Sequence, residues 1–175
     1  IEPMKLPQYY QADDRWGAKR YGLSNMKLTG CVPTALAMAI SGLKEDVNPV
    51  QVADFLYSTT MEMNTTFLGT SSLGVQEVVS QWGLNYKVID SKEELEKTLK
   101  NGTLVYGAVG HGIFVNGYST HAVLLTGYEN GKTKAFDPDN MAKTNKWYNI
   151  DDIWKERSLA PEDNMTGGAF IAIYK

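Results

Sequence analysis

Cys31 is the only cysteine in the chain, and it follows Gly30 at the start of a segment that predicts a helix. The N-terminal end of a helix carries partial positive charge and free N–H groups, which stabilise a thiolate and favour its use as a nucleophile. A free cysteine is nevertheless more often a small, buried apolar residue. The position of Cys31 therefore suits nucleophilic chemistry, but only a nearby base would favour that role over a structural one.

Two histidines, His111 and His121, could supply that base. His121 directly precedes the apolar run 122–125, so its ring is expected at the end of a buried strand, where it could accept the cysteine proton and pass it to a leaving amine. The alternative is a histidine that is satisfied by backbone groups at a strand end. His111 lies between two glycines, which indicates a loop and makes it the weaker candidate.

A carboxylate could orient the imidazole of His121. Asn130-Gly131 lies between two β-like segments and is a strong signal for a two-residue hairpin, which would bring Asp137 back toward His121. A carboxylate there would hold the correct tautomer and stabilise the charged ring. Two alternatives remain: Asp137 begins an Asp-Pro pair that could simply open a turn, and Asp139 is a competing carboxylate.

Attack on an amide also needs hydrogen-bond donors for the developing oxyanion. The backbone N–H of Cys31 can be one donor. A side-chain amide from the amino-terminal region can be the other, with Gln11 as first choice and Gln8 as the alternative. A glutamine in such a polar segment is by default a solvated surface residue.

The elements that would carry these residues form two groups. Residues 1–28 predict an extended arm with turns, and a buried helix is expected from Cys31 to Leu43, with Pro33 in its first turn. Three more helices are expected: one that begins at Asn48-Pro49, one over about Ser72–Trp82, and one that Ser91 and Glu94 cap and Gly102 ends.

Short β-branched or aromatic segments predominate after Asn101 and predict strands. They are Thr103–Val109, Thr120–Glu129, Lys132–Asp137, Asn145–Asn149 and Ala169–Tyr174, with a short helix near Asp151–Arg157. The expected fold class is α+β, with helices first and an antiparallel sheet second. No repeat or linker is visible, so residues 1–175 are expected to form one domain with a mainly helical part to about residue 102 and a mainly sheet part after it.

The composition excludes several function classes. The 175 residues carry 17 Lys and Arg against 20 Asp and Glu, so a broad basic surface for nucleic acid is not expected. A single cysteine permits no internal disulfide and no multi-cysteine metal site. The longest apolar run is far too short to span a bilayer. The segment with Asp137, Asp139 and Asn140 lacks the glycine and glutamate of a calcium loop, so no metal is expected there.

Four motifs occur in a recognisable order along the chain. They are Gln11 with Asp14-Arg15-Trp16, Gly30-Cys31-Val32-Pro33-Thr34-Ala35-Leu36-Ala37-Met38, His121-Ala122-Val123-Leu124-Leu125-Thr126-Gly127-Tyr128, and Asp137-Pro138. Together they resemble the C39-like branch of the papain-like cysteine peptidases, over almost the whole chain from about Leu6 to Tyr174.

The resemblance implies a papain-like fold that needs no metal or organic cofactor. It implies that Cys31 is the nucleophile, His121 the general base and Asp137 the residue that orients the histidine. Gln11 would be the oxyanion-hole donor. One departure is Val32, where the family usually has glycine, and a larger side chain there would narrow the site.

The predicted function is hydrolysis of a peptide or related amide bond through an acyl-enzyme on Cys31. The alternatives are an amidase or acyl transferase with the same triad, and a non-catalytic binding domain that retains the fold. Substrate choice is expected to reside in loops 64–70 and 111–119, beside a cleft between the two parts. The start at Ile1 is compatible with a removed export signal, and similar proteins are often bacterial and exported, so a secreted or cell-surface location is expected.

Overall fold

The computed structural model describes residues 1–59 and 70–175. The helices are α1 (Met26–Thr29), α2 (Cys31–Leu43), α3 (Pro49–Thr59), α4 (Ser72–Gln81), α5 (Lys92–Lys100) and α6 (Ile150–Lys155), with a short 3-10 turn at Pro161–Asp163. The strands are β1 (Arg20–Tyr21), β2 (Ser24–Asn25), β3 (Asn85–Ile89), β4 (Leu104–Val109), β5 (His121–Glu129), β6 (Lys132–Phe136), β7 (Lys146–Asn149) and β8 (Phe170–Tyr174).

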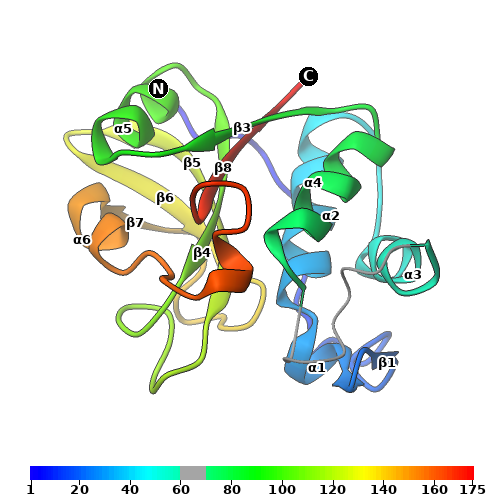
Figure 1. Ribbon diagram of the computed structural model, residues 1–175. Helices are drawn as coiled ribbons and strands as arrows, with labels where there is room; N and C mark the ends of the chain where they lie inside the picture. The colour runs from blue at the N-terminus through cyan, green and yellow to red at the C-terminus, as the bar shows by residue number, and fades with distance from the viewer. Residues whose placement is uncertain (60–69) are drawn as a thin grey trace.

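A six-stranded antiparallel sheet forms one side of the molecule, in the order β3-β8-β4-β5-β6-β7, and α5 and α6 lie beside it (Figure 1). We call this sheet with α5 and α6 the sheet half. The five predicted strands are present, each within two residues of its expected start and end. The sequence analysis missed β3, which pairs with β8 at the other end of the chain, so the sheet also recruits a strand from the mainly helical part.

Helices α1–α4 form the other side, which we call the helical half (Figure 1). The central helix α2 is buried from Val32 to Ile40, because it carries small or apolar side chains on all of its faces. Helices α3 and α4 pack against α2, and α2 itself contacts β5. The prediction of a buried helix from Cys31 to Leu43 is confirmed, and this helix joins the two halves.

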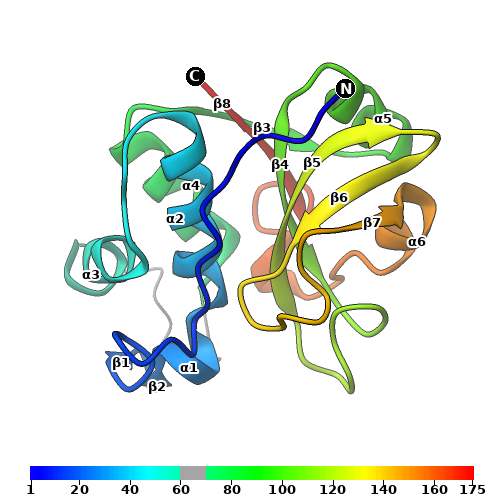
Figure 2. The same cartoon turned by 180° about the vertical axis from the view of Figure 1, so that it is seen from behind.

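The amino-terminal arm runs along the junction of the two halves before it reaches α1 (Figure 2). The Met4 N–H donates to Thr126 Oγ1 of β5 at 2.8 Å, and Leu6 packs directly against Gly42 of α2. The arm therefore contacts the sheet half and the helical half in turn. It ends earlier than predicted, because the segment before Gly30 folds into the small β1–β2 hairpin and the single turn α1.

No helix in the described parts of the chain combines the length and the apolar character needed to cross a bilayer.

Candidate active site

Cys31 is the first residue of α2, and Gly30 alone separates it from α1. A Cβ atom at residue 30 would lie 2.5 Å from the carbonyl oxygen of Met26, so only glycine permits this close junction. Cys31 is half-buried, whereas Val32 is only 4% exposed and belongs to the hydrophobic core. The side chain of Val32 thus packs in the core, and the expectation that it narrows the site stays a prediction.

His121 is the first residue of β5, and its Nε2–H donates to Oδ1 of Asp137 at 2.7 Å. The side chain of His121 is 10% exposed and that of Asp137 is fully buried. Asp137 Oδ1 also accepts the backbone N–H groups of Asp139 at 2.8 Å and Asn140 at 3.2 Å. The other oxygen, Oδ2, is buried without a hydrogen-bond partner among residues 1–59 and 70–175. The carboxylate is thus held so that it can orient the ring.

The β5–β6 hairpin brings His121 and Asp137 together only because it contains a bulge. Asn130 and Gly131 have φ of 49° and 77°, as a tight hairpin turn requires, and Glu129 pairs with Lys132 next to them. Two residues of β5, 127 and 128, then oppose the single residue Thr133 before the pairing resumes at Thr126 and Lys134.

This one-residue shift decides which face of the sheet the two side chains share. Without it, continued pairing from the turn would put Asp137 opposite Leu124 and leave His121 on the other face. With it, Leu124 pairs with Phe136, so the next residue, Asp137, lies opposite Val123. Residue 121 is two positions from Val123 and therefore points to the same face as Asp137.

The environment of His121 favours its charged form. Burial disfavours the imidazolium, but hydrogen bonds with Asp137 and Cys31 and the negative charges of both groups outweigh this effect and raise the pKa of His121 to about 10. Asp137 occupies Nε2, which leaves Nδ1 as the ring nitrogen available to Cys31. The ring is therefore protonated at neutral pH beside the thiol.

The competing candidates for the base and the carboxylate, His111 and Asp139, are both exposed. His111 is exposed, with its Nδ1 3.1 Å from the carbonyl oxygen of Gly117. Asp139 is exposed and contributes its backbone N–H to Asp137. These positions support His121 and Asp137 as the pair that faces Cys31.

Gln11 and Gln8 occupy different environments. Gln11 is 4% exposed; its Nε2 donates to the carbonyl oxygen of Lys27, one helical turn before Cys31, and its backbone N–H donates to Pro138. Its Oε1 is buried and has no hydrogen-bond partner in the described part of the chain. Gln8 uses both ends of its amide near Asp137. Gln11 is thus not a solvated surface residue, and it links the segment before Cys31 to the segment after Asp137.

The sequence analysis did not identify Thr144, whose hydroxyl accepts the backbone N–H of Asp137 at 2.9 Å. No local pattern distinguishes this threonine, because one of its partners, Gln8, lies 136 residues away in the sequence. Of the predicted specificity loops, residues 64–69 lie outside the described residues. Over residues 1–59 and 70–175, no three His, Cys, Asp or Glu side chains converge as a potential metal-ligand set.

Comparison with solved structures shows what this arrangement resembles. A C39-like peptidase from Bacillus anthracis has a TM-score of 0.65 and 15% identity, over 100% of this chain and 98% of that chain. The peptidase domain of ComA from Streptococcus, a bifunctional ABC transporter involved in quorum sensing, has a TM-score of 0.58 and 19% identity, over 84% of this chain and 90% of that chain.

A third structure is a double glycine motif protease from an AMS/PCAT transporter in complex with its leader peptide. It has a TM-score of 0.55 and 19% identity, over 98% of this chain and 91% of that chain. At these identities the matches establish the fold. A search of curated protein sequences gave no significant match.

The match to a sequence-family model is more specific. The model of the peptidase C39-like family matches residues 4–166, a span that includes Gln11, Cys31, His121 and Asp137. The chain belongs to the peptidase C39-like family.

Proposed function

We propose that the protein is a papain-like cysteine peptidase that cleaves a peptide bond through an acyl-enzyme on Cys31. The observation that carries the proposal is the linked arrangement of the three side chains. Asp137 accepts a 2.7 Å hydrogen bond from His121 Nε2, while Cys31 lies close enough to the same ring to help raise the pKa of His121. A nucleophile, a base and an orienting group in this order are the components of acyl transfer.

In the first half of the reaction, the sulfur of Cys31 attacks the substrate carbonyl carbon as a thiolate, while His121 holds the proton. His121 then gives that proton to the leaving amine, the C–N bond breaks and a thioester remains on Cys31. Asp137 keeps the ring oriented and balances its positive charge.

In the second half, His121 takes a proton from water, and the resulting hydroxide equivalent attacks the thioester carbonyl. The C–S bond breaks, the carboxylic acid product leaves and Cys31 returns to its starting state.

Two donors are available for the oxyanion that forms in each half. The N–H of Cys31 lies at the first residue of α2, where the helix dipole also favours negative charge. Gln11 has a second Nε2 hydrogen besides the one directed at Lys27. We assign Gln11 this role rather than Gln8, because the amide of Gln8 is occupied at both ends near Asp137.

A peptide is the proposed substrate class. One protein of the same fold has been solved with its leader peptide, and the triad needs only an amide carbonyl to act. An acyl transferase would share the thioester and differ only in its acceptor, so analysis of the products with and without an added amine separates the two reactions.

The test compares the full chain with its Cys31→Ala variant on a peptide library, with products read by mass spectrometry. Since the chain has a single cysteine, a thioester adduct on the intact protein can be assigned to Cys31 without further mapping. We expect cleavage and a trappable adduct with the wild type alone. Equal cleavage by both proteins, or none by either across the library, would contradict the proposal.

A further inference from the structure

Three hydrogen bonds form a closed ring around the backbone of Asp137. The Asp137 N–H donates to Thr144 Oγ1 at 2.9 Å, the Thr144 hydroxyl donates to Gln8 Oε1 at 2.6 Å, and Gln8 Nε2 donates back to the Asp137 carbonyl oxygen at 3.2 Å. Both polar groups of this peptide backbone are therefore held by two side chains. We call this arrangement the Gln8–Thr144 clamp.

The clamp holds the backbone of Asp137, the residue that accepts the hydrogen bond of His121. The Asp137 carboxylate accepts three hydrogen bonds on Oδ1, and its exposed fraction is zero. The side chain leaves from a backbone position just after β6 ends, where the ladder no longer fixes the chain. The Thr144 hydroxyl thus replaces the strand partner that the Asp137 N–H would otherwise need.

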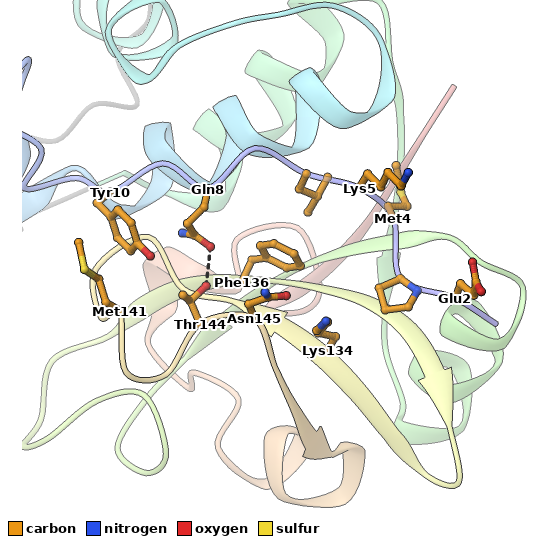
Figure 3. Close-up of a pocket in the computed structure, with 12 residues that line it drawn as sticks. Glu2, Met4, Lys5, Gln8, Tyr10, Lys134, Phe136, Met141, Thr144 and Asn145 are labelled. Atoms are coloured by element: carbon orange, nitrogen blue, oxygen red, sulfur yellow. Dashed lines mark hydrogen bonds between the residues drawn. The ribbon is translucent and has the colours of Figure 1, made fainter.

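The two members of the clamp come from distant parts of the sequence. Gln8 belongs to the amino-terminal arm and Thr144 to the segment between β6 and β7, so the clamp closes across 136 residues. Figure 3 shows Gln8 reaching down from the arm to Thr144, with the hydrogen bond drawn between them. The arm is therefore in direct contact with the support of Asp137.

The clamp lies on the wall of an open pocket of about 790 Å³ between the arm and the sheet. Gln8, Tyr10, Phe136 and Thr144 line it, whereas Cys31, His121 and Asp137 do not (Figure 3). A change at Gln8 or Thr144 therefore removes none of the reacting groups and alters what supports Asp137.

We propose that Gln8 and Thr144 are positioning residues of the active site, which fix the backbone of Asp137 and through it the orientation of His121. This inference rests on the proposed function for its role in catalysis. Loosening the clamp lets the carboxylate move, and a displacement of about 1 Å in such a support can reduce turnover by about 100-fold. The same loosening weakens the hydrogen bond that favours protonated His121.

The experiment measures the titration of His121 by NMR in the full chain. The chain has only two histidines, so a His111→Gln variant assigns the signals. In Thr144→Val the hydroxyl is lost, and we expect the His121 midpoint to fall by about one pH unit. Thr144→Ser keeps the hydroxyl and should restore the wild-type midpoint. Gln8→Met opens the clamp from the arm side, so it should act in the same direction as Thr144→Val.

Thr126→Val is the matched control. The Thr126 side chain is also buried, and its hydroxyl also accepts a backbone N–H, that of Met4 in the arm, but it does not contact Asp137. We expect this variant to lose stability as Thr144→Val does and to leave the His121 midpoint unchanged.

Two results separate this inference from the proposed function. A lowered midpoint in Thr144→Val and Gln8→Met, with rescue by serine, supports positioning even if no peptide is cleaved. The inference is overturned if Thr144→Val and Gln8→Met keep the wild-type His121 midpoint and lose no more thermal stability than Thr126→Val does. The clamp would then have a structural role only, even if the protein is a peptidase.

Discussion

Cys31 lies in the helical half, at the N-terminus of α2, and the next nine residues of this helix are buried. Asp137 lies in the sheet half, in a loop, and three hydrogen bonds meet on one oxygen of its carboxylate. The position of Cys31 is therefore set mainly by steric packing, through the close approach of Gly30 to Met26. The position of the Asp137 carboxylate is set mainly by directed polar contacts. The two halves should thus respond to different kinds of substitution.

The largest effect is expected on the sheet half. Asp137→Ala removes the acceptor of His121 and of two backbone N–H groups, so kcat/KM should fall by about 100-fold to 1000-fold. Asp137→Asn keeps the size of the side chain but loses the charge that selects the correct tautomer and stabilises the charged ring, so its loss should also be large, up to about 10⁴-fold. Kinetics on a peptide substrate and the melting temperature separate lost chemistry from lost folding.

Asp139→Ala is the matched control, because Asp139 is exposed and only its backbone N–H contacts Asp137. Wild-type kinetics in Asp137→Ala, or an equal loss in Asp139→Ala, would remove Asp137 from the account.

A smaller effect is expected from steric change on the helical half. In Gly30→Ala the new Cβ would lie 2.5 Å from the Met26 carbonyl oxygen, so α1 and α2 must move apart, at a cost of about 1–3 kcal/mol in the free energy of unfolding. Alkylation of Cys31 should slow, while the hydrogen bond between His121 and Asp137 stays intact. Chemical denaturation and alkylation kinetics measure the two effects.

Gly110→Ala is the control for this substitution, because its Cβ would meet only the Glu156 carbonyl oxygen, at 3.8 Å. If Gly30→Ala is as stable and as reactive as Gly110→Ala, steric packing does not set the position of Cys31.

The smallest effect is on the pH dependence of stability. His121 has its pKa raised to about 10 from 6.5, so between these values the native state binds more protons than the unfolded state. The stabilisation is complete below pH 6.5 and is lost as the pH rises toward 10. Between pH 6.5 and about pH 8, the stability difference between the wild type and His121→Gln should shrink as this stabilisation is lost.

Denaturant titrations at several pH values measure this difference. The matched variant His111→Gln changes an exposed loop histidine instead and serves as the control. A constant gap between the wild type and His121→Gln would mean that His121 is not preferentially protonated in the folded protein.

Local signals account for what the sequence predicted well. The apolar run after Cys31, the Ser91 cap and the Asn130-Gly131 turn each specify their element within a few residues, and the structure has all three. Strand β3 was missed because three of its five residues are exposed and its partner strand lies at the far end of the chain.

The candidate site residues were named from the sequence, but not the reason that they come together. The turn signal alone would place His121 and Asp137 on opposite faces. The bulge opposite Thr133 corrects this, and its local signal is Gly127, a glycine inside the strand with a φ of 82°. The clamp of Gln8 and Thr144 depends equally on long-range contacts. A secreted or cell-surface location stays a prediction.

The central claim, that His121 activates Cys31, is tested most directly by the rate of Cys31 alkylation as a function of pH in the wild type and in His121→Ala. With a single cysteine, every adduct reports on the site. We predict that the wild type reacts readily at about pH 6. The variant should react slowly at that pH and faster only as the pH approaches ~8.5, the pKa of an ordinary thiol. If the alkylation rates of both proteins show the same pH dependence and rise only near pH ~8.5, the account is contradicted.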